Sequence, residues 1–393
     1  MENDSYHSSD SSIPLKRLAI IWTNFGPYHM ARIRALTNYF DVQAIELADY
    51  QRLYRWEKED DEVPVITLKK GASEDQGQLG VALELWRQLS KLRPTVVLVP
   101  GYATLPAICA ALWGRAHGAS TFLMSESNFD DHPRHSFSEV VKRVLVTLLF
   151  NGGIVGGKRA ASYLQRLGMP AKRIGWAYDV VDNEYFSSRA AQCRRELDHS
   201  GNGSQPLYFL FVGRLAPEKN VSTLLDAFGK YRDSGGAWHL VIAGDGPLNK
   251  ALRAQADALI RSGKVVFTGH KSVNGLPSLY AFAGCFVLPS LREPWGLVVN
   301  EAMASGLPVI VSSRCGCSDD LVENEANGFI IDPSNVFDLT AALERMARLS
   351  EKERAKMAKK SQTIIAGYST ERWASEVARI VNTLHNEGST NEI

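Results

Sequence analysis

The sequence of 393 residues lacks several features that would each assign it to a particular class of protein. Its charges nearly cancel, with 44 Lys and Arg against 43 Asp and Glu, so it lacks the basic excess that binding to nucleic acid requires. No apolar run approaches the roughly 18 residues that cross a bilayer; the longest, Val144–Phe150, is far shorter. Residues 1–14 have no apolar stretch typical of a signal peptide and are expected to form a disordered tail.

Cysteine is equally scarce, and its pattern excludes a disulfide framework. The five cysteines are odd in number and widely spaced, which indicates a reducing, cytoplasmic compartment. Cys315 and Cys317 stand close together, but no second pair of Cys or His lies at zinc-ligand spacing. We therefore expect tight packing of small residues there and no metal site.

Short apolar runs that end in turn residues alternate with helical segments along the chain. Strands are expected at 18–22, 96–99 and 121–124, and again at 207–212, 239–243, 265–267, 285–288 and 308–311. This alternation indicates parallel βαβ units, and its restart near residue 207 indicates two Rossmann-like, doubly wound α/β domains. Ligands of such sheets bind beyond the carboxyl ends of the strands, so the expected site is the cleft between the domains.

The division of the chain follows from this pattern. We predict an N-terminal domain at 15–186, a Gly/Ser-rich linker at 187–206, a second domain at 207–368, a helix at 369–386 and a tail at 387–393. The helix carries one wide apolar stripe that must be buried. We expect it to cross back and pack on the N-terminal domain through Trp373, Val377, Ile380, Val381 and Leu384.

Two cations follow the first predicted strand of the second domain. Gly213 allows a tight turn after that strand, and Arg214 and Lys219 come next. A guanidinium fork and an ammonium group at the carboxyl end of a strand suit a diphosphate. Taken alone, these residues are equally typical of solvated surface charges.

A second group of candidate residues follows the strand at 285–288. A helix is expected to begin near Gly296, so the N–H groups of Leu297 and Val298 would form an anion site at its positive end. Glu293 precedes this helix, and Glu301 lies about a turn and a half inside it. Taken alone, this element is also typical of an amphipathic helix with exposed glutamates.

Together these spacings resemble glycosyltransferase family 4 of the GT-B fold. The resemblance rests on Gly-Arg-x4-Lys, on Glu-x7-Glu, and on Ala243–Pro247, Phe267–His270 and Asn327–Pro333, and it is close over about residues 207–333. It implies a retaining glycosyltransferase that moves a sugar from a UDP- or GDP-sugar to a carbohydrate, lipid-linked or small-molecule acceptor in polysaccharide or glycoconjugate synthesis. It also implies that the chain end returns to the N-terminal domain.

The resemblance assigns roles to individual residues. Arg214 and Lys219 would contact the donor diphosphate, Glu293 the sugar, Glu301 the ribose, and the loop at His270 the base. No cofactor and no essential metal are expected, because the cations and the helix N-terminus neutralise the diphosphate. The backbone positions expected near the donor are Gly213, Gly244, Gly296, Leu297 and Val298; for Gly244 a purely structural turn is an equal alternative.

The N-terminal half fits the family less well. It has only Gly26 where many members have a glycine-rich loop, and Glu126 stands near the place where many have a histidine. We expect Gly26 to border the donor and Glu126 to take the polar catalytic role, with a structural carboxylate as the alternative. His29 is either functional or an ordinary residue at a helix start. The stretches 155–159 and 178–186 are expected to act as a hinge.

Other functions remain open from the sequence. A sugar-nucleotide epimerase, a phosphorylase and a non-catalytic sugar-nucleotide sensor share the fold, whereas an NAD-dependent oxidoreductase would need a G-x-G-x-x-G turn that the strands do not offer. The amphipathic segment 138–150, with Lys142 and Arg143, is either a core helix, which we favour, or a helix that lies on a membrane bearing the acceptor. The oligomeric state is not predicted.

Overall fold

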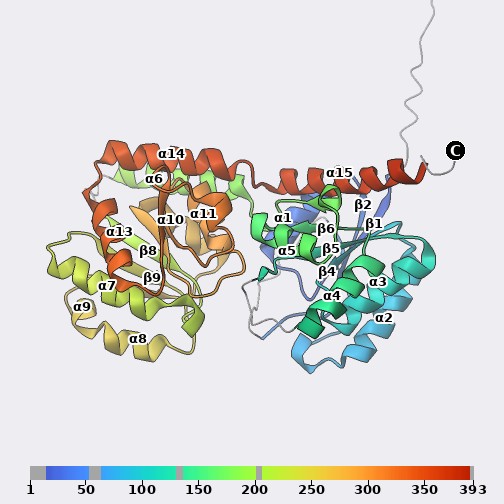
Figure 1. Ribbon diagram of the computed structural model, residues 1–393. Helices are drawn as coiled ribbons and strands as arrows, with labels where there is room; N and C mark the ends of the chain where they lie inside the picture. Colours follow the sequence, from blue (N-terminus) through green and yellow to red (C-terminus); the bar gives the residue numbers. More distant parts are fainter. Residues whose placement is uncertain (1–14, 53–62, 130–135, 201–205, 390–393) are drawn as a thin grey trace, which may run out of the picture.

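A computed structural model of the chain describes residues 15–52, 63–129, 136–200 and 206–389. Two α/β domains face each other, and the last two helices run along one side of both (Figure 1). The predicted tail at 1–14 and the last four residues, 390–393, lie outside the described residues.

The N-terminal domain is one parallel sheet with helices on both faces. Its elements are β1 Arg17–Trp22, α1 Pro27–Leu36, β2 Asp41–Glu46, β3 Val65–Thr67, η1 Ser73–Asp75, α2 Gln78–Leu92, β4 Val96–Pro100, α3 Leu105–His117, β5 Ser120–Ser125, α4 Ser136–Leu149, β6 Gly152–Val155, α5 Lys158–Arg166, η3 Ala171–Arg173 and β7 Ile174–Gly175.

The C-terminal domain repeats this architecture. Its elements are α6 Asn183–Ser200, β8 Tyr208–Val212, η4 Pro217–Lys219, α7 Val221–Asp233, β9 His239–Ala243, α8 Asn249–Gln255, α9 Asp257–Arg261, β10 Val265–Gly269, η5 Val273–Gly275, α10 Leu276–Phe282, β11 Cys285–Leu288, α11 Leu297–Ala304, β12 Val309–Ser312, α12 Ser318–Leu321, β13 Gly328–Ile331, α13 Val336–Arg348 and α14 Glu351–Ile365.

Both sheets reverse their strand order at one point. The orders are β3-β2-β1-β4-β5-β6-β7 and β10-β9-β8-β11-β12-β13, so the reversals lie between β1 and β4 and between β8 and β11. All the recorded strand pairs are parallel, and central strands such as β4, β11 and β12 are buried almost throughout because helices cover both faces of each sheet. The loops after β8 and β11 therefore flank the crevice where such sheets bind ligands.

The C-terminal helix α15, Thr370–Ser389, confirms the predicted crossing. Trp373, Val377, Ile380 and Val381 are buried in the same cluster as Ile33 and Leu36 of α1. Helix α15 thus lies over the same face of the first sheet as α1 (Figure 1), and its apolar stripe is buried there. The helix continues three residues beyond the predicted end at 386.

The predicted linker at 187–206 is wrong over most of its length. Residues 183–200 form α6, and the last residues assigned to the N-terminal domain, up to Phe186, already belong to it. Phe186 and Ala190 are buried, because α6 packs on α10 and α11 of the second domain. The Gly/Ser-rich residues 201–205, on which the linker prediction rested, lie outside the described residues.

Candidate functional site

The structure brings the predicted cation loop and the Glu293 loop together at the reversal point of the second sheet. Arg214 and Lys219 follow β8, Glu293 follows β11, and these strands are hydrogen-bonded neighbours. The ammonium group of Lys219 donates to the carboxylate of Glu293, which also accepts from Ser290 Oγ at 3.4 Å. Both partners are largely buried, so a strong charge pair lies at the base of the cleft.

The guanidinium group of Arg214 has one hydrogen-bond donor that no described residue uses. One guanidinium nitrogen pairs with Glu218 one helical turn along the chain. The buried Nε atom finds no acceptor among the described residues. A buried, unsatisfied donor costs about 1–3 kcal/mol, so this atom favours an anionic ligand.

The helix α11 begins as predicted. Gly296, its N-cap, has a φ of 107°, a conformation that strains any residue with a side chain. The first N–H groups of a helix have no partner inside it, and those of Leu297 and Val298 occupy these positions. The helix thus presents an anion site beside Lys219 and Glu293.

Glu301 is far more enclosed than the sequence suggested. It is 1% exposed, and its two carboxylate oxygens accept hydrogen bonds of 2.7 Å from Tyr28 of α1 and Tyr280 of α10. Burial raises its pKa to about 7, although both tyrosines oppose this effect. The N-terminal domain therefore occupies one of the positions that a ribose would need at Glu301.

The predicted glycines and His270 line the neighbouring strand ends. Gly244 has a φ of 149°, and a Cβ atom there would lie 1.9 Å from the carbonyl oxygen of Gly213. Gly244 N–H donates to Gly269 O at 2.8 Å, next to the exposed His270. Contact between the two loops is thus sufficient to explain Gly244 structurally, while His270 remains open to a ligand.

In the N-terminal domain, His29 and Gly26 form the start of α1. Gly26 N–H donates to His29 Nδ1 at 3.0 Å, and burial lowers the pKa of His29 well below its usual range. His29 packs on Trp22 with ring centroids 4.6 Å apart. The histidine therefore caps a helix, and its use as an acid or base at neutral pH is disfavoured.

Glu126 lies close to a second carboxyl group. Burial, and then the neighbouring Glu126, raise the pKa of Asp179 well above its usual range. Two residues on, Asn128 Nδ2 donates to Pro294 O at 2.9 Å, and Pro294 follows Glu293. The loop after β5 thus brings Glu126 to the same side of the cleft as Glu293.

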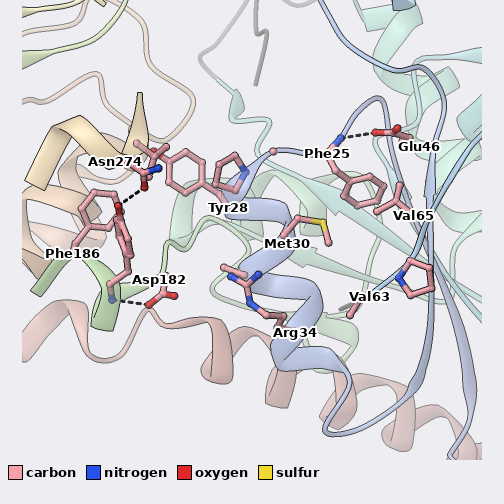
Figure 2. A pocket seen from close by; sticks show the side chains of 16 residues that line it. Phe25, Tyr28, Met30, Arg34, Glu46, Val63, Val65, Asp182, Phe186 and Asn274 are labelled. Atoms are coloured by element: carbon pink, nitrogen blue, oxygen red, sulfur yellow. Dashed lines mark hydrogen bonds between the residues drawn. The ribbon is translucent and has the colours of Figure 1, made fainter. Parts of the chain in front are cut away.

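A cavity of about 340 Å³ opens between the domains beside Tyr28 (Figure 2). Phe25, Met30 and Val65 give it an apolar wall in the N-terminal domain, and Val273 and Asn274 close it from the loop after β10. Tyr185 Oη donates to Asn274 Oδ1 at 2.7 Å at this end. The cavity therefore borders the strand end where the base is expected.

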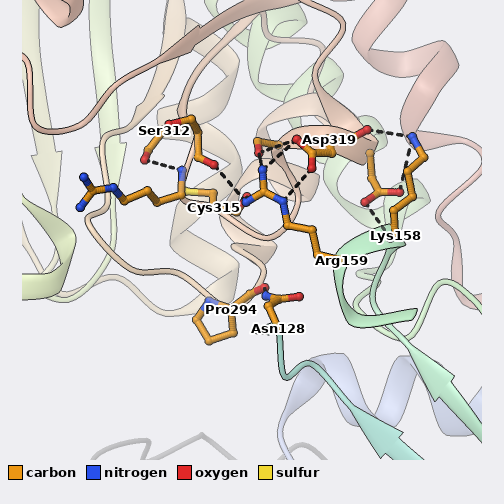
Figure 3. A network of polar contacts seen from close by, with 11 residues as sticks. Asn128, Lys158, Arg159, Pro294, Ser312, Cys315 and Asp319 are labelled. Atoms are coloured by element: carbon orange, nitrogen blue, oxygen red, sulfur yellow. Dashed lines mark hydrogen bonds and ion pairs between the residues drawn. The ribbon is translucent and has the colours of Figure 1, made fainter. Parts of the chain in front are cut away.

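On another side, the stretch expected to act as a hinge makes polar contacts between the domains (Figure 3). Arg159 at the start of α5 donates to both carboxylate oxygens of Asp319, at 2.7 and 2.8 Å, and to Ser313 O at 3.0 Å. Lys158 N–H donates to Asp320 at 3.1 Å. These contacts hold the two domains together next to Glu293 in the closed arrangement.

Cys315 and Cys317 are both buried, and burial raises the pKa of each thiol. Among the described residues, no group of three or more His, Cys, Asp or Glu side chains is arranged to hold a metal ion. No helix in the described part of the chain has the length and apolarity that a bilayer crossing demands.

The sequence reasoning missed three residues of this site. Tyr28 and Tyr280 hold Glu301, and Asp179 faces Glu126. Asp179 lies in the stretch 178–186 and Tyr28 two positions after Gly26, but no spacing rule pairs a tyrosine with a carboxylate 273 positions away. The roles of all these residues toward a ligand stay predictions.

Comparison with known proteins supports the assignment of the second domain. Residues 194–363 match the family model described as glycosyl transferases group 1. An uncharacterized glycosyltransferase of Methanocaldococcus jannaschii is 38% identical over 137 residues, which cover 35% of each chain. A GDP-mannose-dependent phosphatidylinositol dimannoside mannosyltransferase of Mycobacterium tuberculosis is 30% identical over 57% of this chain and 58% of that protein. The chain thus spans between a third and three fifths of these curated relatives.

Similar solved structures extend over nearly the whole chain. The structure of Anabaena HepE in complex with UDP and glucose has a TM-score of 0.71 at 17% identity and covers 94% of this chain and 100% of that one. A sucrose-phosphate synthase of Thermosynechococcus elongatus has a TM-score of 0.70 at 17% identity. At this identity the likeness shows the fold alone, which is the two-domain GT-B fold.

Proposed function

We propose that the protein is a retaining, nucleotide-sugar-dependent glycosyltransferase of family 4, a proposal supported by the match of residues 194–363 to the family model described as glycosyl transferases group 1. It moves a sugar from a UDP- or GDP-sugar to a carbohydrate, lipid-linked or small-molecule acceptor. One observation carries the proposal: Arg214, Lys219, Glu293 and the start of α11 converge where the second sheet reverses its strand order. Such a cationic crevice fits a diphosphate with a sugar attached.

The proposed roles follow the course of a bound donor. Arg214, Lys219 and the N–H groups at the start of α11 neutralise the charge that develops on the leaving diphosphate. Glu293 orients the transferred sugar, and Lys219 holds that carboxylate in place. Because these groups supply positive charge without a metal, we propose that no metal ion is essential.

The nucleoside lies toward the other end of the cleft. Its ribose takes the place of the Tyr28 hydroxyl on Glu301, and its base lies between His270 and the cavity bordered by Val273 and Asn274. Glu126 faces the acceptor from the N-terminal domain. We place the reaction in the cytoplasm, in the assembly of a polysaccharide or glycoconjugate.

The test is the release of nucleoside diphosphate from a panel of UDP-, GDP- and ADP-sugars. Wild-type protein is expected to turn over one donor, by slow hydrolysis or by transfer to an added acceptor. The Lys219→Ala variant is expected to lose this activity while its circular dichroism spectrum remains that of the folded protein. Donor binding without any turnover across donors and acceptors would instead identify a sugar-nucleotide sensor.

A further inference from the structure

The helix α4 carries apolar side chains on two opposite faces. Val146 and Leu149 are buried against the first domain. The opposite face shows Phe137, Val140, Val141, Val144 and Leu148 at the i, i+3, i+4, i+7 and i+11 spacing of one helical stripe, each between 42% and 81% exposed. We call these five residues the α4 stripe. A helix that only covers a core would carry polar side chains on this outward face.

The stripe lies beside the opening of the cleft. Helices α2, α3 and α4 cover the face of the first sheet opposite α15 (Figure 1). Each of them follows a strand, so its first turn lies at the edge where the strands end and the cleft begins. Leu79 and Leu83 of α2 and Leu105 of α3 add exposed apolar side chains near this edge.

Among the described residues of α4, the exposed charge beside the stripe is positive. The single acidic residue of α4, Glu139, is turned inward, where it pairs with Lys142 at 2.7 Å and accepts from Tyr163 Oη at 2.9 Å. Arg143 is exposed beside the stripe and donates to Arg166 O at 2.8 Å. The guanidinium group of Arg166 lies 4.6 Å from the ring centroid of Phe129, which is also exposed.

We propose that the α4 stripe docks the protein on the surface of an anionic lipid bilayer. Apolar side chains flanked by arginines are the combination that enters the interface between headgroups and acyl chains. A second copy of the chain is a poorer occupant, because a face-to-face pair would bring the Arg143 and Arg166 groups of both copies together. Docking of this kind turns the cleft opening toward the bilayer. The protein would then take its acceptor from the membrane, an inference that rests on the proposed glycosyltransferase function.

Vesicle sedimentation of the full chain, without donor, tests the docking. Wild-type protein is expected to bind vesicles of phosphatidylcholine mixed with phosphatidylglycerol more tightly than vesicles of phosphatidylcholine alone, with the difference lost in high salt. Burying a Phe side chain contributes about 1.5–3 kcal/mol, so Phe137→Glu should weaken binding by at least roughly tenfold. Arg143→Ala should weaken binding to the anionic vesicles alone, by about fivefold.

The second domain offers a matched control, because Phe337 of α13 is 68% exposed and Phe137 is 81% exposed. Phe337→Glu should bind vesicles like the wild type. Equal binding by both variants, or no binding by wild-type protein, overturns the proposal. So does a lipid-free dimer in light scattering that Phe137→Glu dissociates, since the stripe would then join two copies. Donor turnover is measured separately, in solution and without vesicles. A failure to bind vesicles therefore refutes the docking but not the proposed reaction, and a failure to turn over donor refutes the reaction but not the docking.

Discussion

Replacing Tyr28 by phenylalanine tests how the two domains share Glu301. Both oxygens of this buried carboxylate accept hydrogen bonds of 2.7 Å, one from Tyr28 in the first domain and one from Tyr280 in the second. Because Glu301 is 1% exposed, a ribose can reach it only if one of these tyrosines moves away. Tyr28 is the one that domain opening withdraws, so the closed, empty protein competes with its own donor.

The size of this competition follows from the chemistry of the bond. A hydrogen bond to a charged group contributes about 1.5–3 kcal/mol, which corresponds to roughly 10–150-fold in an equilibrium constant. Tyr28→Phe keeps the ring and removes only this bond, so donor binding should tighten by up to about tenfold, the lower end of that range. Tyr280→Phe should weaken donor binding by a similar factor, because Tyr280 orients Glu301 from within the donor domain.

Calorimetric titration with the donor measures both changes. Tyr231→Phe is the control, since its hydroxyl accepts from Trp238 N–H in the core of the second domain, away from the cleft. Unchanged affinity in both the Tyr28 and Tyr280 variants would remove Glu301 from the donor site. Equal weakening in both would mean that Tyr28 binds the ribose and does not compete with it.

Further predictions concern the charged groups of the cleft. Arg214→Ala and Lys219→Ala should each lower turnover about 10²–10³-fold in steady-state assays, with intact folding by circular dichroism. Activity should survive excess EDTA; a loss restored by magnesium or manganese would contradict the metal-free proposal. Glu293→Gln should lower kcat more than donor affinity, whereas Glu301→Ala should mainly raise KM by roughly 10–150-fold. Because burial raises the pKa of Glu301 to about 7 and ribose hydroxyls donate to the ionised form, donor affinity should fall as the pH drops below about 7; a flat profile from pH 6 to 8 would refute this assignment.

The donor side of the cleft was predictable because its residues follow strands at fixed spacings. Arg214, Lys219 and Glu293 each lie just beyond a strand that the apolar pattern identifies, and parallel sheets bring such positions together. The return of α15 was predictable for a similar reason, since the wide stripe around Trp373 requires a partner surface.

The remaining features depend on contacts between distant parts of the chain. The prediction of a linker missed α6, whose first turns are held in the fold by a few buried side chains such as Phe186 and Ala190. The helical pattern alone left Glu301 exposed, but Tyr280 contacts it within the second domain, and Tyr28 encloses it only when the two domains are closed. Local spacing carries no information on such an approach.

A structure determined with the nucleoside diphosphate bound tests the central claim most directly. The account predicts the diphosphate between Arg214 and Lys219 at the start of α11, with a ribose hydroxyl on Glu301 in place of the Tyr28 hydroxyl. A nucleotide bound within the first domain, or one that leaves the Tyr28–Glu301 hydrogen bond intact and Arg214 without contact, would contradict it.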